Sequence, residues 1–139
     1  MAFAGINYLA VVVSALAGFL FAALWYGAFR RAWLNAMGRT GSEVTSRGMR
    51  LVVPVIIAVA CSLIMAFVLA GAIGHLGPGQ VTVRNGVISG AFLWFGFVFT
   101  TIATNHAFQA ARPSLTLIDC GAWLGVLLVQ GAVIGWMGV

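Results

Sequence analysis

The arginines of this chain are concentrated in one short segment between two long apolar runs. Five of the seven basic residues lie within residues 30–50, and the chain contains no lysine. Moving a guanidinium group through the hydrocarbon core of a bilayer is costly, so clusters of this kind stay on one side of a membrane. The cluster therefore predicts that the flanking apolar runs cross a membrane, and it also indicates their orientation.

The composition agrees with a chain that is surrounded by lipid. Of the 139 residues 63% are hydrophobic and 6% are charged, whereas soluble domains carry about 25% charged residues. A helix needs about 20 apolar residues to cross the hydrocarbon core. We therefore predict a single all-α domain over residues 1–139, a polytopic membrane protein with four transmembrane helices in an antiparallel bundle. The predicted spans are residues 6–29, 51–74, 84–108 and 113–137.

Local signals mark the ends of these spans. Trp25 and Tyr26 precede the arginine segment, as aromatic residues at headgroup depth often do. Residues 30–37 are expected to form a short interfacial helix that stops at Gly38. Pro113 opens the last span after a tight connection, so the third and fourth spans should be antiparallel neighbours.

The distribution of arginines predicts the orientation. Six arginines flank the first and third connections, whereas only Arg84 flanks the second. By the positive-inside rule the first and third connections are cytoplasmic, and both termini lie outside the inner membrane of a bacterium. The expected partners of the basic loop 30–50 are anionic lipid headgroups, so no nucleic acid is needed to explain the charge. The arginines concerned are Arg30, Arg31, Arg39, Arg47 and Arg50.

Asp119 is the only acidic residue within a predicted span. An ionised carboxylate at this depth needs a partner. Arg112 lies seven residues earlier on the same helical face, and Arg30 or Arg31 lies at a similar depth. One interpretation is an ion pair that fixes the fourth helix, and the other is a functional proton or cation site.

Other polar residues are expected at the same depth as Asp119. The third span ends in its most polar segment, and a histidine at such a position is typical of a helix-end cap. His75 lies on the opposite side, so the two histidines are not expected to bind one haem, and no metal or cofactor is predicted. The candidate polar cluster or ligand site comprises Trp25, Tyr26, Asn105, His106, Arg112 and Asp119.

Helical spacing predicts three polar or small-residue stripes that point into the bundle. They are Asn7–Ser14–Gly18–Trp25, Ser89–Gly96–Thr100–Ala107 and Arg112–Asp119–Gln130. Ser14, Ser89, Thr100 and Gln130 are interpreted as packing and helix–helix hydrogen bonds. Glycines four residues apart permit close helix contacts within the bundle or in a homo-oligomer. These pairs are Gly86/Gly90, Gly121/Gly125 and Gly131/Gly135.

Several sequence blocks along the chain are distinctive. The most distinctive is Leu24-Trp25-Tyr26-Gly27. The others are Asn7-Tyr8-Leu9-Ala10, Ala32-Trp33, Met65-Ala66-Phe67-Val68-Leu69-Ala70, Trp94-Phe95-Gly96-Phe97, Arg112-Pro113, Leu117-Ile118-Asp119 and the Gly131 to Trp136 segment. Together these blocks resemble a bacterial family of small four-helix membrane proteins, number seventeen-sixty-one in the domain-of-unknown-function series. The resemblance covers nearly the whole chain and implies the four-helix topology, with no activity or catalytic residue.

Three functional hypotheses follow from the sequence. We favour a non-enzymatic integral membrane protein that forms an oligomer or serves as an accessory subunit of a membrane complex. The alternative is a small proton-coupled transporter or channel that uses Asp119. A membrane enzyme or haem carrier is disfavoured, because enzymes that act on lipids usually place several His, Asp or Glu residues at one interface, and here Asp119 and His106 are nearly alone.

Overall fold

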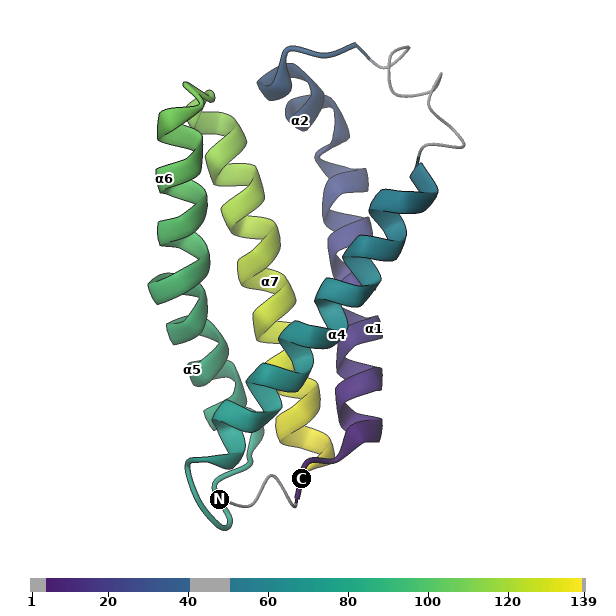
Figure 1. Ribbon diagram of the computed structural model, residues 1–139, viewed down its shortest axis with the longest axis vertical. Coiled ribbons are helices and arrows are strands. Elements are labelled where there is room, and N and C mark those ends of the chain that lie inside the picture. The colour runs from purple at the N-terminus through teal and green to yellow at the C-terminus, as the bar shows by residue number, and fades with distance from the viewer. Residues whose placement is uncertain (1–4, 41–50, 139) are drawn as a thin grey trace.

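The computed structural model describes residues 5–40 and 51–138 (Figure 1), and every regular element in them is helical. Four helical spans are long and apolar enough to cross a membrane, which confirms the predicted fold class. Their bounds agree with the prediction within two residues. The elements are α1 (Tyr8–Ala28), α2 (Arg30–Met37), α4 (Val52–Gly74), α5 (Val83–Leu93), the π-helix η2 (Trp94–Phe99), α6 (Thr100–Phe108) and α7 (Pro113–Met137).

The helix ends follow from local chemistry. Asn7, which was predicted to lie on an inward-facing stripe, is partly buried and caps α1. Its side-chain oxygen accepts a hydrogen bond from the Ala10 amide at 3.1 Å. Gly38 ends α2 in the left-handed conformation, with a φ of 67°, as expected for a glycine after a helix. Pro113 begins α7, where its missing N–H costs little. The basic segment around Arg47 and Arg50 lies outside the described residues.

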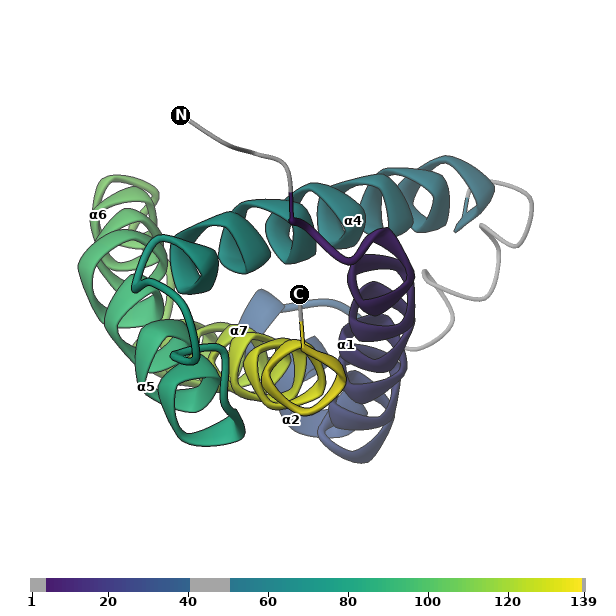
Figure 2. The same ribbon diagram turned by 90° about the horizontal axis from the view of Figure 1, so that it is seen from below.

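The helices are arranged around α7. Figure 2 shows α7 between α1 on one side and α5 on the other, while α4 runs obliquely across one face of the bundle. The connection between α6 and α7 lies at the same end of the molecule as α2 (Figure 1). We call this the α2 end. Helix α1 begins and α7 finishes at the opposite end.

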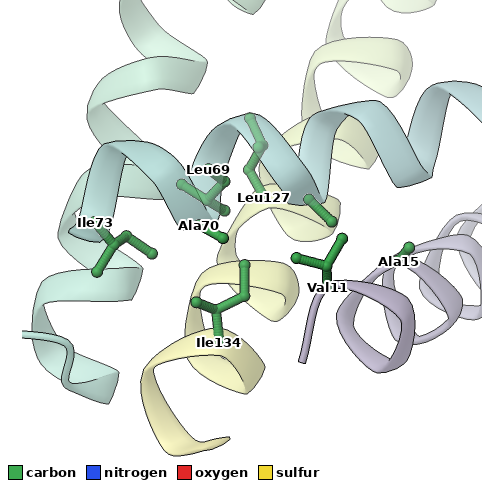
Figure 3. Close-up of a cluster of buried hydrophobic side chains, with 8 residues drawn as sticks. Val11, Ala15, Leu69, Ala70, Ile73, Leu127 and Ile134 are labelled. Atoms are coloured by element: carbon green, nitrogen blue, oxygen red, sulfur yellow. The ribbon is translucent and has the colours of Figure 1, made fainter. Parts of the chain in front are cut away.

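The buried core lies in the half of the bundle away from α2 (Figure 3). It takes residues from the first half of α1, the second half of α4 and the second half of α7, whereas no residue of η2 or α6 is buried. Toward the α2 end the first turns of α4, from Val52 to Ile57, are exposed. The core residues are Val11, Ala15, Ala66, Leu69, Ala70, Ile73, Leu127 and Ile134.

Glycines allow α5 and α7 to approach each other closely in this half. A Cβ atom on Gly86 or on Gly131 would overlap the backbone of the other residue, and a Cβ atom on Gly90 would lie 2.6 Å from the Leu127 carbonyl oxygen. Gly121 and Gly125 of α7 face the aromatic rings of α1 instead. The glycine pairs predicted from the sequence are therefore used within the bundle.

A buried polar contact joins three helices near the middle of the bundle. The Ser62 hydroxyl on α4 donates to the Ala15 carbonyl on α1 at 2.8 Å. The side-chain amide of Gln130 on α7 donates to the Ser62 hydroxyl at 3.1 Å and to its carbonyl at 3.2 Å. Gln130 therefore makes the helix–helix hydrogen bonds expected from its position. Its partner Ser62 was not predicted from the sequence.

The stripe predicted along the third span is wrong in its second half. Gly96, Thr100 and Ala107 are exposed, and the Thr100 hydroxyl donates to the Gly96 carbonyl of its own helix at 2.8 Å. The stripe assumed a constant 3.6 residues per turn. The π-helix η2 has wider turns, so the residues that follow it are rotated away from the face that Gly86 and Gly90 present to α7.

Candidate functional site

Asp119 lies on α7 in the α2-end half of the bundle and contacts side chains from two other helices. The Tyr26 hydroxyl, near the end of α1, donates a hydrogen bond to Asp119 Oδ1 at 2.8 Å. His106 of α6 places Nε2 at 3.6 Å from Asp119 Oδ2. One carboxylate thus connects α1, α6 and α7. We call the group of Tyr26, His106, Thr116 and Asp119 the Asp119 centre.

Thr116 belongs to the centre because it holds the other side of the imidazole. Its hydroxyl lies 2.9 Å from His106 Nδ1. When Nε2 carries the ring proton, the hydroxyl donates to Nδ1 and Nε2–H points to the carboxylate; a protonated ring donates to both groups. His106 therefore joins α6 to α7 and is not a simple helix-end cap. Thr116 was not predicted from the sequence, although it lies one turn before Asp119, and this spacing places both residues on one face of α7.

Two indole rings hold α7 on either side of Asp119. Trp25 of α1 donates from Nε1 to the Ile118 carbonyl at 3.1 Å, and Trp94 of η2 donates to the Cys120 carbonyl at 2.8 Å. A Cβ atom on Gly121 would lie 2.7 Å from the Trp25 ring, so this glycine makes room for it. Trp25 was predicted as part of the site and borders the centre. Trp94 was not predicted, because nothing in a lone tryptophan indicates which carbonyl its N–H will meet.

Arg112 does not pair with Asp119, contrary to the expected ion pair. Its Nη1 donates to the Asn35 carbonyl of α2 at 2.6 Å. Seven residues along a helix separate two Cα atoms by about 10 Å, and Arg112 lies at the start of α7, directly beside α2. The Asn35 carbonyl is close to the C-terminus of α2, where unsatisfied carbonyls attract cations. In the described residues the basic side chain nearest to the Asp119 carboxylate is that of His106, which forms an ion pair only when the imidazole is protonated.

Asn105 and the arginines of α2 lie outside the centre. Asn105 is exposed, and no described hydrogen bond joins its side chain to Asp119 or His106. Arg30 and Arg31 line a separate groove on α2 and do not contact the carboxylate. Of the six residues predicted for the site, the structure thus joins Tyr26, His106 and Asp119 directly.

Contacts also connect α2 to the elements of the centre. The Tyr26 ring packs edge-to-face against Trp33 of α2, with ring centroids 5.4 Å apart. The bond from Arg112 to Asn35 ties α2 to α7. A displacement of α2 would therefore reach the centre through Tyr26 and through the start of α7.

The centre is partly accessible, and the groups beside its carboxylate are not permanently charged. The side chains of His106 and Asp119 are 15% and 20% exposed. Unlike an arginine, the imidazole and the phenol beside this carboxylate need not carry a charge. Over the described parts of the chain, no three His, Cys, Asp or Glu side chains are grouped closely enough to hold a metal ion.

Comparison with known protein families gives a match over most of the chain. A family model described as "Protein of unknown function (DUF1761)" matches residues 9–135, which include the whole Asp119 centre and all but the ends of the helical bundle. No curated protein and no solved structure matches the chain. The match agrees with the family resemblance of the sequence blocks.

Proposed function

Because the chain belongs to the DUF1761 family, whose description assigns no activity, we propose a function from the geometry of the Asp119 centre. The protein would be a non-enzymatic, multi-pass protein of the bacterial inner membrane that acts as a small proton-coupled transporter or channel. A single observation supports this. The one acidic side chain in the described spans is held by a tyrosine and a histidine instead of an arginine.

The choice of partners determines what the carboxylate can do. A guanidinium is always charged, so an arginine would keep Asp119 ionised and held in an ion pair. With a neutral His106 the ionised centre carries one negative charge, and a charge without a cationic partner within a membrane-spanning segment is costly. Binding a proton or a small cation removes this charge. Proton and cation would therefore compete for Asp119, which is the minimal requirement for coupling their movements.

The proposed orientation places the centre near the cytoplasmic surface. The arginine bias puts α2 and the α6–α7 connection in the cytoplasm, and the centre lies on the same side of the bundle as these elements. Protons would then reach Asp119 from the cytoplasm, and the packed half of the bundle would lie on the periplasmic side. Both ends of the chain would be periplasmic.

Proton transport can be tested in liposomes that contain the purified protein and an internal pH-sensitive dye. A potassium diffusion potential drives proton movement. We expect wild-type vesicles to acidify faster than empty vesicles, and Asp119→Asn to abolish the difference. Glu43→Gln, which removes the only other acidic residue, is the matched control and should transport like wild type. Equal proton flux in wild-type and Asp119→Asn vesicles would contradict the proposal.

The orientation has its own test. A single cysteine at residue 43, in a background where Cys61 and Cys120 are alanine, should react with a membrane-impermeant maleimide only after the inner membrane is opened. Reaction in intact spheroplasts would place the basic loop in the periplasm and overturn the proposed orientation. It would leave the geometry of the centre unaffected.

A non-enzymatic oligomer or an accessory subunit is the second candidate. It is favoured by a run of exposed aromatic side chains on α5 and η2, where Phe92, Phe95 and Phe97 are between 64% and 75% exposed. Such a surface suits a neighbouring helix as well as lipid. The glycine pairs give no further support, because they are occupied within the chain. A monomeric particle without partners after purification in a mild detergent would remove this candidate.

A further inference from the structure

Helix α2 and the residues that follow it form an open groove, and three of its six lining residues are arginines. The groove has a volume of about 500 Å³, and we call it the α2 groove. This space is large enough for a small polar group. Its lining residues are Arg30, Arg31, Leu34, Asn35, Arg39 and Thr40.

The charges of the α2 groove are not balanced by acidic residues of the described chain. The whole sequence contains seven arginines and two acidic residues. Asp119 is engaged by Tyr26 and His106, and Glu43 lies outside the described residues. Even if Glu43 paired with one arginine, at least two of the three groove arginines would have no acidic side chain of this chain as a partner and could bind an anion from elsewhere.

The position of the groove favours a lipid as the source of that anion. Leu34 and Ala36 of α2 are buried, whereas Arg30, Arg31 and Arg39 are exposed. Helix α2 follows directly after a membrane-spanning helix, and its Trp33 packs on Tyr26. Tryptophan and tyrosine side chains gather at the depth of lipid headgroups, so the groove lies where phosphates of the bilayer are available.

We infer that the α2 groove binds the phosphate of one anionic phospholipid. Guanidinium groups suit this ligand, because their planar N–H donors match two phosphate oxygens at once. The lining residue Asn35 also accepts the hydrogen bond from Arg112, so the bound headgroup would stabilise the contact between α2 and α7. This inference rests on the groove alone and does not depend on proton transport.

The test is native mass spectrometry of the whole protein in detergent micelles doped with phosphatidylglycerol or phosphatidylcholine. We expect wild type to retain one phosphatidylglycerol and to discriminate against phosphatidylcholine. Each arginine near a lipid surface contributes about 1 kcal/mol, which corresponds to about fivefold in affinity. Arg39→Gln should therefore weaken retention about fivefold, and Arg31→Gln combined with Arg39→Gln about 30-fold.

Arg84→Gln is the matched control, because it removes the same charge outside the groove and should leave retention unchanged. Equal losses in Arg39→Gln and Arg84→Gln would overturn the inference in favour of general charge attraction. Equal retention of the two lipids would overturn it as well. If an excess of inorganic phosphate displaces the lipid completely, the groove is a site for soluble anions instead. The substituted arginines are exposed, and tryptophan fluorescence on heating checks that the variants are folded.

Discussion

The two halves of the bundle are held together by different means. Away from α2, backbones approach closely at Gly86, Gly90 and Gly131, and the buried aliphatic core fills the remaining space. Toward α2, long side chains connect the helices. Trp25 and Trp94 bind carbonyls of α7, and Tyr26 and His106 bind its carboxylate.

This difference suggests that one half of the bundle determines stability and the other half carries the function. Close-packed backbones leave no space for a ligand and cannot move without separating the helices. Polar side chains that bridge wider gaps can change partners or protonation without disturbing the fold. We therefore expect the half away from α2 to determine stability, and the half with the Asp119 centre to respond to protons and lipids.

The largest effect is expected from a side chain added at the closest backbone contact. Gly131→Leu would force α7 away from Gly86 on α5, and we expect a loss of about 3 kcal/mol or more in the free energy of unfolding. Thermal unfolding in detergent, followed by tryptophan fluorescence, measures the loss. Gly96→Leu is the control, because nothing lies within 4 Å of a Cβ at this position. Equal loss in both variants would contradict the division into two halves.

A smaller effect is expected from the tyrosine of the Asp119 centre. Tyr26→Phe removes the hydroxyl that donates to the carboxylate, and we expect it to cost about 1.5 kcal/mol. The same unfolding measurement applies. Tyr8→Phe is a matched control at the other end of α1, where Tyr8 is 67% exposed, and it should leave stability unchanged. If both variants are as stable as wild type, the bond from Tyr26 to Asp119 does not hold α1 against α7.

The smallest of the three effects is expected from the polar contact at mid-bundle. Ser62→Ala removes the donor to Ala15 and one acceptor of Gln130, and hydrogen bonds between membrane helices contribute roughly 1 kcal/mol. The exposed neighbour Cys61 gives the control Cys61→Ala, which should show no change. A larger loss in Ser62→Ala than in Gly131→Leu would reverse the expected order and place the main stabilising contact at mid-bundle.

Most of the fold could be predicted from the sequence because a bilayer limits the choices. Hydropathy gave four spans, and Gly38 and Pro113 marked helix ends correctly, since their backbone preferences act locally. The π-helix η2 was not predicted. It depends on how Trp94 and its neighbours pack against α7, and the spacing of apolar residues in the sequence does not contain this information.

The candidate site could be predicted only in part. Asp119 stood out because it is the only acidic residue in a span, and Tyr26 and His106 were correctly placed at its depth. Which of these groups would meet the carboxylate depends on the rotation of each helix about its axis. A sequence does not give that rotation. Arg112, one of the ion-pair partners considered for Asp119, in fact binds Asn35.

We expect Asp119 to exchange a proton while the rest of the bundle stays folded. Infrared difference spectra of the protein in lipid, recorded as the pH is lowered, detect the C=O stretch of a protonated carboxylic acid. We expect a band that grows with falling pH in wild type and in Glu43→Gln, whereas the Glu43→Gln/Asp119→Asn double variant, which has no acidic side chain left, loses it. The amide bands of the helices should not change. An identical carboxylic-acid signal in wild type and Asp119→Asn would contradict the claim.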